Sequence, residues 1–245
     1  MAGKNWKRKY NKKKGRGKRN FRPPKLVSIG PYFPPKMIVK HKFQHVYALA
    51  QSYNDSGGGF DNQETNNFRL NGLFDIDTKV GAGTGQQPRM YDEMSQFYDT
   101  YKVLGAKAYI KFINLSEEPV YVCTQIGGYQ MTDNGSIDLN DWREMKNTTV
   151  NILHGLNTGP KSVRTIVRNY SPAKIEGISK TEFRHRHKDF SAMYTTTPTV
   201  PHYLSTAMTQ VSSTLGGSAN TNVQVELTIH FTAEWSGVKL LSDQS

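Results

Sequence analysis

Residues 221–235 read TNVQVELTIHFTAEW, and apolar and polar side chains alternate along the whole segment. Successive side chains of a β-strand point to opposite faces of a sheet, so this alternation predicts one long strand with one buried face. A strand with a single apolar face is typical of a packed antiparallel sheet. The expected buried face carries Val223, Val225, Leu227, Ile229, Phe231, Ala233 and Trp235.

Strand patterns recur along the rest of the chain, and turn residues such as Gly127-Gly128 and Gly216-Gly217 separate them. Helical spacing of apolar residues occurs in two segments, 90–101 and 139–145. Many strands without regular helix alternation predict an all-β sandwich, and a single jelly roll of two antiparallel sheets with Greek-key connections fits best. The further strands are expected at about 37–49, 66–74, 105–115, 119–126, 161–170, 179–188 and 203–212.

Positive charge is concentrated at the N-terminus, and no acidic residue occurs before Asp55. The chain has 32 Lys and Arg against 20 Asp and Glu; without the twelve cations of residues 1–25, the remainder is formally neutral. A block of like charges cannot bury enough apolar surface to fold alone, so we expect a mostly disordered arm with a Pro-rich hinge over 1–35 and a jelly-roll domain over 36–245. The twelve cations are Lys4, Lys7, Arg8, Lys9, Lys12, Lys13, Lys14, Arg16, Lys18, Arg19, Arg22 and Lys25.

This arm has the chemistry of a polyanion-binding segment. Cations that neutralise phosphates release condensed counterions, and Trp6, Tyr10 and Phe21 lie among the cations, where aromatic rings can stack on unpaired bases. Residues 7–19 also match a nuclear import signal. A solvated tail without a ligand is the plainer alternative. The arm lacks the apolar stretch of a secretory signal.

Residues 68–112 carry a run of local motifs in one order. They are an FDID turn, a Gly-rich loop, GQQP, a helix with paired aromatic residues, and the strand YKVLGAKAYIKF. This segment resembles the capsid proteins of circovirus-like viruses, which have circular single-stranded DNA and encode a replication initiator. The resemblance implies a jelly-roll subunit in a T=1 icosahedral shell of about 60 copies.

The same resemblance implies where the chain acts and with what. It implies a virion protein whose arm packages single-stranded DNA inside the shell and carries new subunits into the host nucleus through import receptors. It further implies a host cell-surface receptor of unknown identity, and binding of non-specific RNA after expression in a foreign cell. It implies no cofactor.

Basic residues of the body are a second set of candidate DNA contacts. Each group shares one face of an expected strand and, with Trp6 and Tyr10, supplies the cation-plus-aromatic surface that an inner shell wall needs. A solvated outer face would produce the same pattern. The candidates are Lys107, Tyr109 and Lys111; Arg164 and Arg168; and Arg184 and Arg186.

Other chemistry has weaker support in the sequence. His185 and His187 have the spacing of a metal pair on a strand, but the carboxylate and second motif of a cupin do not follow. Asp75 and Asp77 are expected to be solvated, and the lone Cys123 to be an inert buried thiol in a protein made in a reducing compartment. We therefore expect no enzyme activity, catalytic residue or metal site. A cellular nucleic-acid-binding protein with a basic tail remains the alternative.

Overall fold

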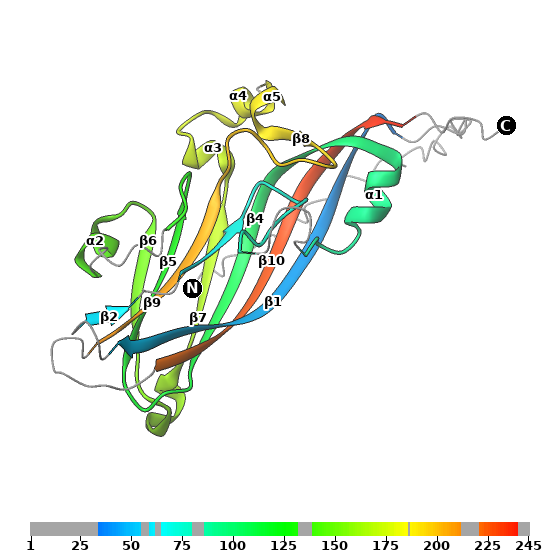
Figure 1. Ribbon diagram of the computed structural model, residues 1–245. Helices are drawn as coiled ribbons and strands as arrows, with labels where there is room; N and C mark the ends of the chain where they lie inside the picture. The colour runs from blue at the N-terminus through cyan, green and yellow to red at the C-terminus, as the bar shows by residue number, and fades with distance from the viewer. Residues whose placement is uncertain are drawn as a thin grey trace, which may run out of the picture. The chain divides into compact units, whose positions relative to one another are not determined.

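The alternating segment near the C-terminus forms strand β10 (Thr221–Val238), which lies in the middle of the larger of two antiparallel sheets. Its neighbours are β1 (Lys36–Asn54) and β4 (Tyr98–Asn114), so the first and last long strands are side by side (Figure 1). β10 pairs with β1 from Ser236 and Lys36 at one end to Thr221 and Gln51 at the other. Strand β7 (Val163–Tyr170) pairs with the other edge of β4.

This computed structural model describes residues 34–54, 59–61, 65–79, 86–131, 139–185, 187–211 and 221–239. The basic arm and all twelve of its cations lie outside the described residues, as do the Gly-rich loop at 81–85 and Arg186. The division into an arm and a jelly-roll domain therefore stays a prediction.

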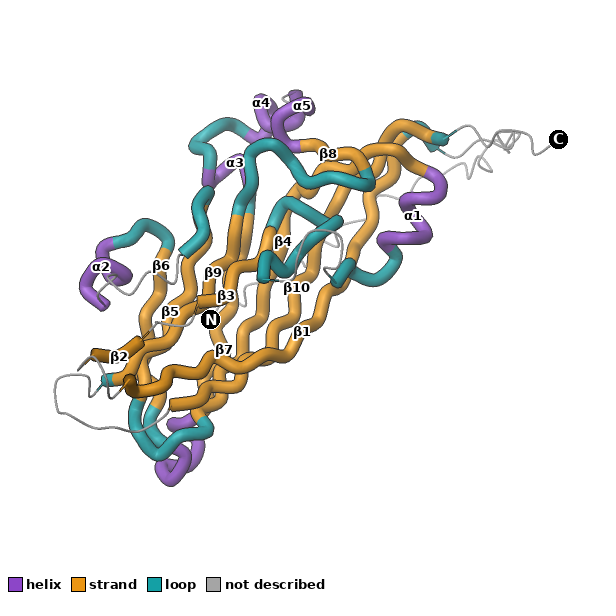
Figure 2. The backbone as a smooth tube through the Cα atoms, viewed as in Figure 1, coloured by secondary structure: helices purple, strands orange, loops and turns teal. Residues whose placement is uncertain are grey.

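The smaller sheet contains four strands in the order β3, β9, β5, β6. Short strands β2 and β8 pair with the end of β1 and with β4, and the short helices α1 to α5 and η1, a 3₁₀ helix, connect strands (Figure 2). The bounds are β2 Gly59–Asp61, β3 Thr65–Arg69, β5 Val120–Gly127, β6 Thr148–Leu153, β8 Ser191–Met193, β9 Tyr203–Gln210, α1 Tyr91–Phe97, α2 Leu139–Glu144, η1 Leu156–Ser162, α3 Pro172–Ile175, α4 Lys180–His185 and α5 His187–Phe190.

The order of the eight principal strands identifies the fold. With β2 and β8 set aside, the larger sheet is ordered β1, β10, β4, β7, and every connection crosses to the other sheet except the one from β5 to β6. Two four-stranded sheets connected in this way are a jelly roll. The predicted fold class is confirmed.

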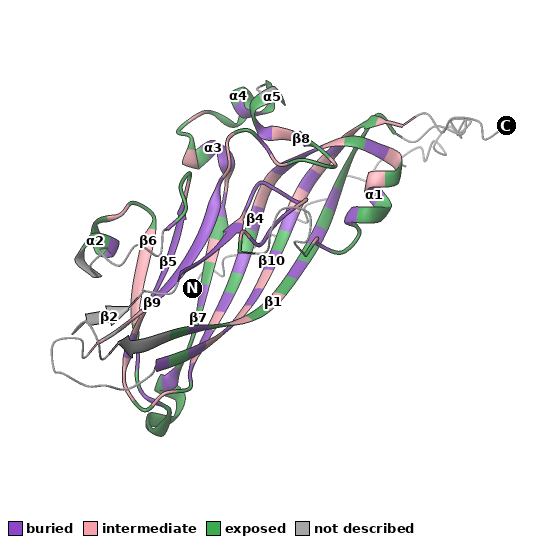
Figure 3. Cartoon of the chain, in the orientation of Figure 1, coloured by how far each residue is buried: buried purple, intermediate pink, exposed green. Residues whose placement is uncertain are grey.

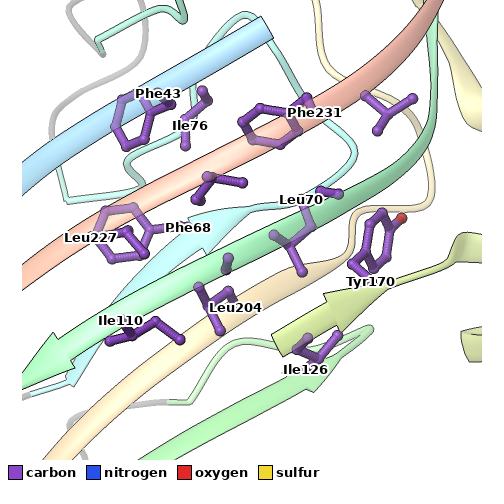
Figure 4. Packing of buried hydrophobic residues seen from close by; sticks show 14 of the residues in the cluster. Phe43, Phe68, Leu70, Ile76, Ile110, Ile126, Tyr170, Leu204, Leu227 and Phe231 are labelled. Atoms are coloured by element: carbon purple, nitrogen blue, oxygen red, sulfur yellow. The ribbon is translucent and has the colours of Figure 1, made fainter. Parts of the chain in front are cut away.

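The core lies between the two sheets. Burial alternates along β1, β4 and β10, as Figure 3 shows in bands of buried and exposed residues. Phe43, Leu227 and Ile110 of the larger sheet pack in one cluster with Phe68 and Leu204 of the smaller sheet (Figure 4). All seven residues of the expected buried face of β10 are buried, so this assignment of faces is confirmed: Val223, Val225, Leu227, Ile229, Phe231, Ala233 and Trp235.

Two expected elements differ from the structure. The strand expected over 179–188 is wrong, because this segment forms the short helices α4 and α5. The helix expected over 90–101 ends at Phe97, and its last part belongs to β4. Tyr98 and Tyr101 are drawn into the strand by burial of their rings and by hydrogen bonds from their hydroxyl groups to the carbonyl oxygens of Pro34 and Thr196, at 2.9 and 2.8 Å.

Other expectations are confirmed with shifted ends. The expected strands at 37–49, 105–115, 119–126, 161–170 and 203–212 correspond to β1, β4, β5, β7 and β9, and α2 occupies the second expected helix. The strand expected at 66–74 ends at Arg69, and β6 was not expected at all. No helix in the described part of the chain is long and apolar enough to cross a membrane.

Candidate nucleic-acid interface

The side of the larger sheet that faces away from the core carries a group of exposed cations. Lys107 and Lys111 of β4 project to this side together with Tyr109, because the intervening residues Ala108 and Ile110 point into the core. These three candidates therefore share one face, as the alternation of β4 predicted. We call this side of β1, β10, β4 and β7 the open face.

Two further lysines on β1 belong to the open face. The register of the sheet aligns Lys42 with His230 of β10, and His230 with Lys107 of β4. Lys40 is two residues along β1 and is also exposed. The sequence contained the signal for both lysines, since they alternate with the apolar positions of β1, but only the sheet register shows that they lie near Lys107.

Acidic residues partly neutralise the margins of the open face. Glu226 lies 3.2 Å from the Nζ atom of Lys111, and Glu234 lies 2.8 Å from that of Lys36. Both pairs are partly exposed to solvent, where such ion pairs contribute little to stability. Within the described part of the chain, no ion pair joins Lys40, Lys42 or Lys107 to an acid. These three ammonium groups carry the positive charge of the central region.

Aromatic rings lie directly among these cations. The Nζ atom of Lys107 lies 4.9 Å from the centroid of the Tyr109 ring, and the rings of Tyr109 and His230 meet at 88° with centroids 5.8 Å apart. Exposed rings beside cations are the elements that bind unpaired nucleotides, since the rings stack on bases and the cations attract phosphates. The open face therefore has the chemistry expected of a single-strand interface.

The arginines of β7 do not join this group. The pairing of β4 with β7 places Lys107 opposite Asn169 and Lys111 opposite Thr165, so Arg164 and Arg168 point to the other side of the sheet. Arg168 donates hydrogen bonds to the hydroxyl group of Thr149 and to the backbone carbonyl of Asn147, which tie β7 to the smaller sheet. Burial lowers the pKa of the Arg168 guanidinium. Arg168 has a structural role in these contacts.

The third group of candidates is not on a strand. Arg184 lies on α4 and is exposed, and the strand face that it was expected to share with Arg186 and Lys188 does not exist. The nearby outward end of β4 is covered instead: Lys102 is buried, its Nζ atom donates to the carbonyl oxygen of Phe183, and it lies 4.1 Å from the centroid of that ring. Burial lowers the pKa of the Lys102 amine. At the Lys102 end of β4, the open face is therefore covered by the residues of α4.

The residues that the sequence offered as a cation-binding pair and as a thiol, Asp75, Asp77 and Cys123, are all buried. Asp75 and Asp77 are buried, which corrects the expectation that they are solvated; Asp77 lies 3.4 Å from His45 Nε2, and Asp75 lies 4.0 Å from Arg69 Nη1. Cys123 is buried as expected, and burial raises the pKa of its thiol to about 12. Among the described residues, no group of three or more His, Cys, Asp or Glu could hold a metal ion.

Comparison with known proteins gives structural matches alone. No protein-family model matches the chain. No curated protein matches it at a significant level. A chain of Desmodium yellow mottle tymovirus is 13% identical, with a TM-score of 0.40 over 88% of this chain and 95% of that chain.

Two further matches come from viruses of crustaceans. A Macrobrachium rosenbergii nodavirus semi-empty VLP is 10% identical, with a TM-score of 0.41 over 85% of this chain and 97% of that chain. Mud crab tombus-like virus is 8% identical, with a TM-score of 0.43 over 86% and 94%. At these identities and scores the likeness assigns no function to the chain.

Proposed function

We propose that this chain is a viral capsid subunit that self-assembles into a small icosahedral shell and packages circular single-stranded DNA. The observation that carries the proposal is the separation of charge along the chain. Twelve cations lie in residues 1–25, before β1, whereas the remaining sequence, which includes every described strand of the jelly roll, is formally neutral. A neutral body can pack closely against copies of itself, and a cationic arm can bind a polyanion without disturbing those contacts.

The fold alone does not select this function, because jelly rolls also occur in lectins and cupins. The arm distinguishes the capsid proposal from these alternatives. In a T=1 shell of about 60 copies, the arms would bring roughly 700 cations to the interior, enough to neutralise a large share of a small genome. Closed shells of identical subunits form through heterologous contacts repeated around symmetry axes.

The proposal includes the route of the subunit through the cell. Residues 7–19 of the arm are proposed to engage host import receptors, so that assembly takes place in the nucleus before the subunit enters the virion. The open face is proposed to meet the packaged strand on the inner wall of the shell, through Lys107, Tyr109 and Lys111, with Lys40 and Lys42 as additional contacts. Phosphate contacts of this kind carry no sequence preference. The same chemistry predicts that the protein takes up RNA in a foreign host.

A purified full-length preparation tests the proposal directly. Negative-stain micrographs should show uniform closed particles, and the nucleic acid inside them should survive nuclease treatment that degrades added free DNA. A variant lacking residues 1–25 provides the control, since it should retain the β-rich circular dichroism of the body but contain far less protected nucleic acid. A full-length protein that stays monomeric or dimeric under all assembly conditions would contradict the capsid proposal.

A cellular nucleic-acid-binding protein with a basic tail is the second candidate. The exposed cations and rings of the open face favour it, since they could bind a strand without any shell. The size of the purified protein separates the two candidates. A monomer that binds oligonucleotides and forms no particles would support the second.

A further inference from the structure

The open face contains a hollow of about 510 Å³ at its centre. The sheet register explains why it forms. Lys40, Thr232 and Gly105 make one row across β1, β10 and β4, and Lys42, His230 and Lys107 make the next. Gly105 lines the hollow and has no side chain, and a Cβ at this position would lie only 3.2 Å from the backbone oxygen of Tyr170. The residues lining the hollow are Lys40, Gly105, Ala106, Lys107, Tyr109, His230, Phe231 and Thr232.

The lining of the hollow suits an anion. Lys40 and Lys107 contribute two ammonium groups, Thr232 contributes a hydroxyl group, and no carboxylate occurs among the lining residues. Lys40 and Lys107 lie two strands apart and in adjacent rows, so their Cα atoms are about 12 Å apart at the usual strand spacing and rise. Flexible side chains of this length can turn from both sides toward one phosphate group and donate charge-assisted hydrogen bonds to its oxygens.

One wall of the hollow is aromatic, which favours a ligand that carries a flat ring as well as a phosphate group. Tyr109 and His230 line the hollow and meet edge to face, so each ring leaves apolar surface beside the cations. The contact of Lys107 with the Tyr109 ring is exposed and therefore weak, which leaves the ammonium group free to turn toward a ligand. A volume of this size lies within the range of about 300–1,000 Å³ that is usual for small-molecule sites.

We propose that this hollow binds one nucleotide of an unpaired strand, with the phosphate between Lys40 and Lys107 and the base against Tyr109 and His230. The inference rests on the proposed function, in which the open face meets packaged single-stranded DNA, and it names the position on that face where a nucleotide is held. Duplex nucleic acid does not fit the proposal, because its bases are already stacked and unavailable. The site should accept all bases, since every base offers a face for stacking.

Photocrosslinking of the full-length chain tests this site. Particles or soluble protein are incubated with a single-stranded oligonucleotide that carries 5-iodouracil, irradiated, and digested for mass spectrometry. We expect a crosslinked peptide that contains Tyr109 or His230, in addition to any crosslinks in residues 1–25. The double variant Lys40→Gln/Lys107→Gln should reduce the crosslink yield in the body at least fivefold. A His230→Ala variant should reduce the yield at Tyr109 by removing the adjoining ring.

Two matched controls separate the hollow from general charge. Lys161→Gln/Lys174→Gln removes the same net charge from exposed positions on η1 and α3, outside the hollow, and should leave the yield at Tyr109 unchanged. Lys36→Gln/Glu234→Gln removes an ion pair at the margin of the same face without changing net charge, and it should also leave the yield unchanged. Circular dichroism of each variant confirms that the sheet is intact.

The outcomes distinguish the hollow from the capsid proposal. Crosslinks confined to residues 1–25, or an equal fall for the hollow double variant and the Lys161→Gln/Lys174→Gln control, would overturn the hollow even if micrographs showed shells. An unchanged yield at Tyr109 in His230→Ala, with loss in the lysine double variant, would show that the base contacts Tyr109 without His230 and would contradict the proposed placement of the base against both rings. Tyr109 crosslinks in a protein that forms no particles would support the hollow and refute the shell.

Discussion

The side-chain amide of Asn67 hydrogen-bonds both backbone polar groups of Met131, in the way that a neighbouring strand would. Asn67 Nδ2 donates to the Met131 carbonyl oxygen at 2.8 Å, and the Met131 N–H donates to Asn67 Oδ1 at 3.1 Å. The Ser205 hydroxyl donates to the same Oδ1 at 2.5 Å. All three residues are buried. Asn67 thereby holds the segment after β5 against the outer side of the smaller sheet, where Met131 and Trp142 cover Cys123.

The first prediction concerns this contact. Asn67→Asp should lower the free energy of unfolding by about 3 kcal/mol, because it removes the buried Nδ2–H donors and places a carboxylate oxygen against the Met131 carbonyl. Ser205→Ala should cost about 1 kcal/mol, since Oδ1 keeps the hydrogen bond from Met131 N–H. Urea unfolding followed by tryptophan fluorescence measures both values. Equal costs would show that the paired contact with Met131 is not what stabilises the segment.

A second prediction concerns the two sides of β10. Ile229→Asp should cost several kcal/mol, because it buries an unpaired carboxylate in the core between the sheets. Thr228→Asp lies one residue away on the open face and should cost less than about 1 kcal/mol. Thermal unfolding of the two variants gives the comparison. Similar losses in both would contradict the assignment of faces.

The sequence predicted the sheets well because period-two burial is a local property. The same alternation predicted that Lys107 and Tyr109 share an exposed face. It could not predict the hollow, because the approach of Lys40 and His230 to Gly105 depends on the pairing of three strands that are far apart in the chain. Two of these strands, β1 and β10, lie near opposite ends of the chain.

The errors have equally specific causes. The segment around His185 and His187 alternates like a strand, yet Phe183 and Phe190 bury their rings against Lys102 from short helices. Arg168 looked like a free cation because the sequence does not show that β6 provides Thr149 as its partner. In both cases the local sequence pattern was compatible with two structures. Contacts between distant parts of the chain stabilise the one that was not predicted.

The third prediction concerns Cys123. Burial raises the pKa of its thiol to about 12, so at pH 8 roughly one molecule in ten thousand carries a native thiolate. Ellman's reagent should therefore react with the folded protein only as fast as the protein unfolds, and rapidly in 6 M guanidinium chloride. Fast native labelling at pH 8 would contradict the buried position.

The same pKa has a consequence for stability at high pH. The folded-state value lies above the unfolded value, so the contribution of the buried thiol is fully present below about pH 9 and is lost as pH rises toward 12. Cys123→Ala should lose less stability than the wild type between pH 9 and pH 10.5. Parallel urea titrations at the two pH values measure this difference, and identical slopes would contradict it.

The fourth prediction concerns the arm. For single strands, the slope of log affinity against log salt is about −0.7 for each phosphate neutralised, so a peptide of residues 1–25 that engages all twelve cations should approach −8. Partial engagement should still give about −4 or steeper, and the aromatic residues should add a salt-insensitive part of about 1–3 kcal/mol per stacked base. Titration of a fluorescent oligonucleotide at several salt concentrations measures both parts. A shallow slope, or strong preference among mixed sequences of equal length, would make the arm a specific recognition element.

The position of β10 in the larger sheet also constrains how the chain can fold. β10 is synthesised after every other described strand, yet it supplies the partner edge for both β1 and β4. Until it emerges from the ribosome, those two long strands have no neighbour between them and their apolar faces remain incomplete. Contacts between such distant segments fold slowly, because the chain must close a long loop before they form. Nascent chains therefore pass through a stage with open strand edges, and a chain that terminates before residue 221 cannot complete the sheet.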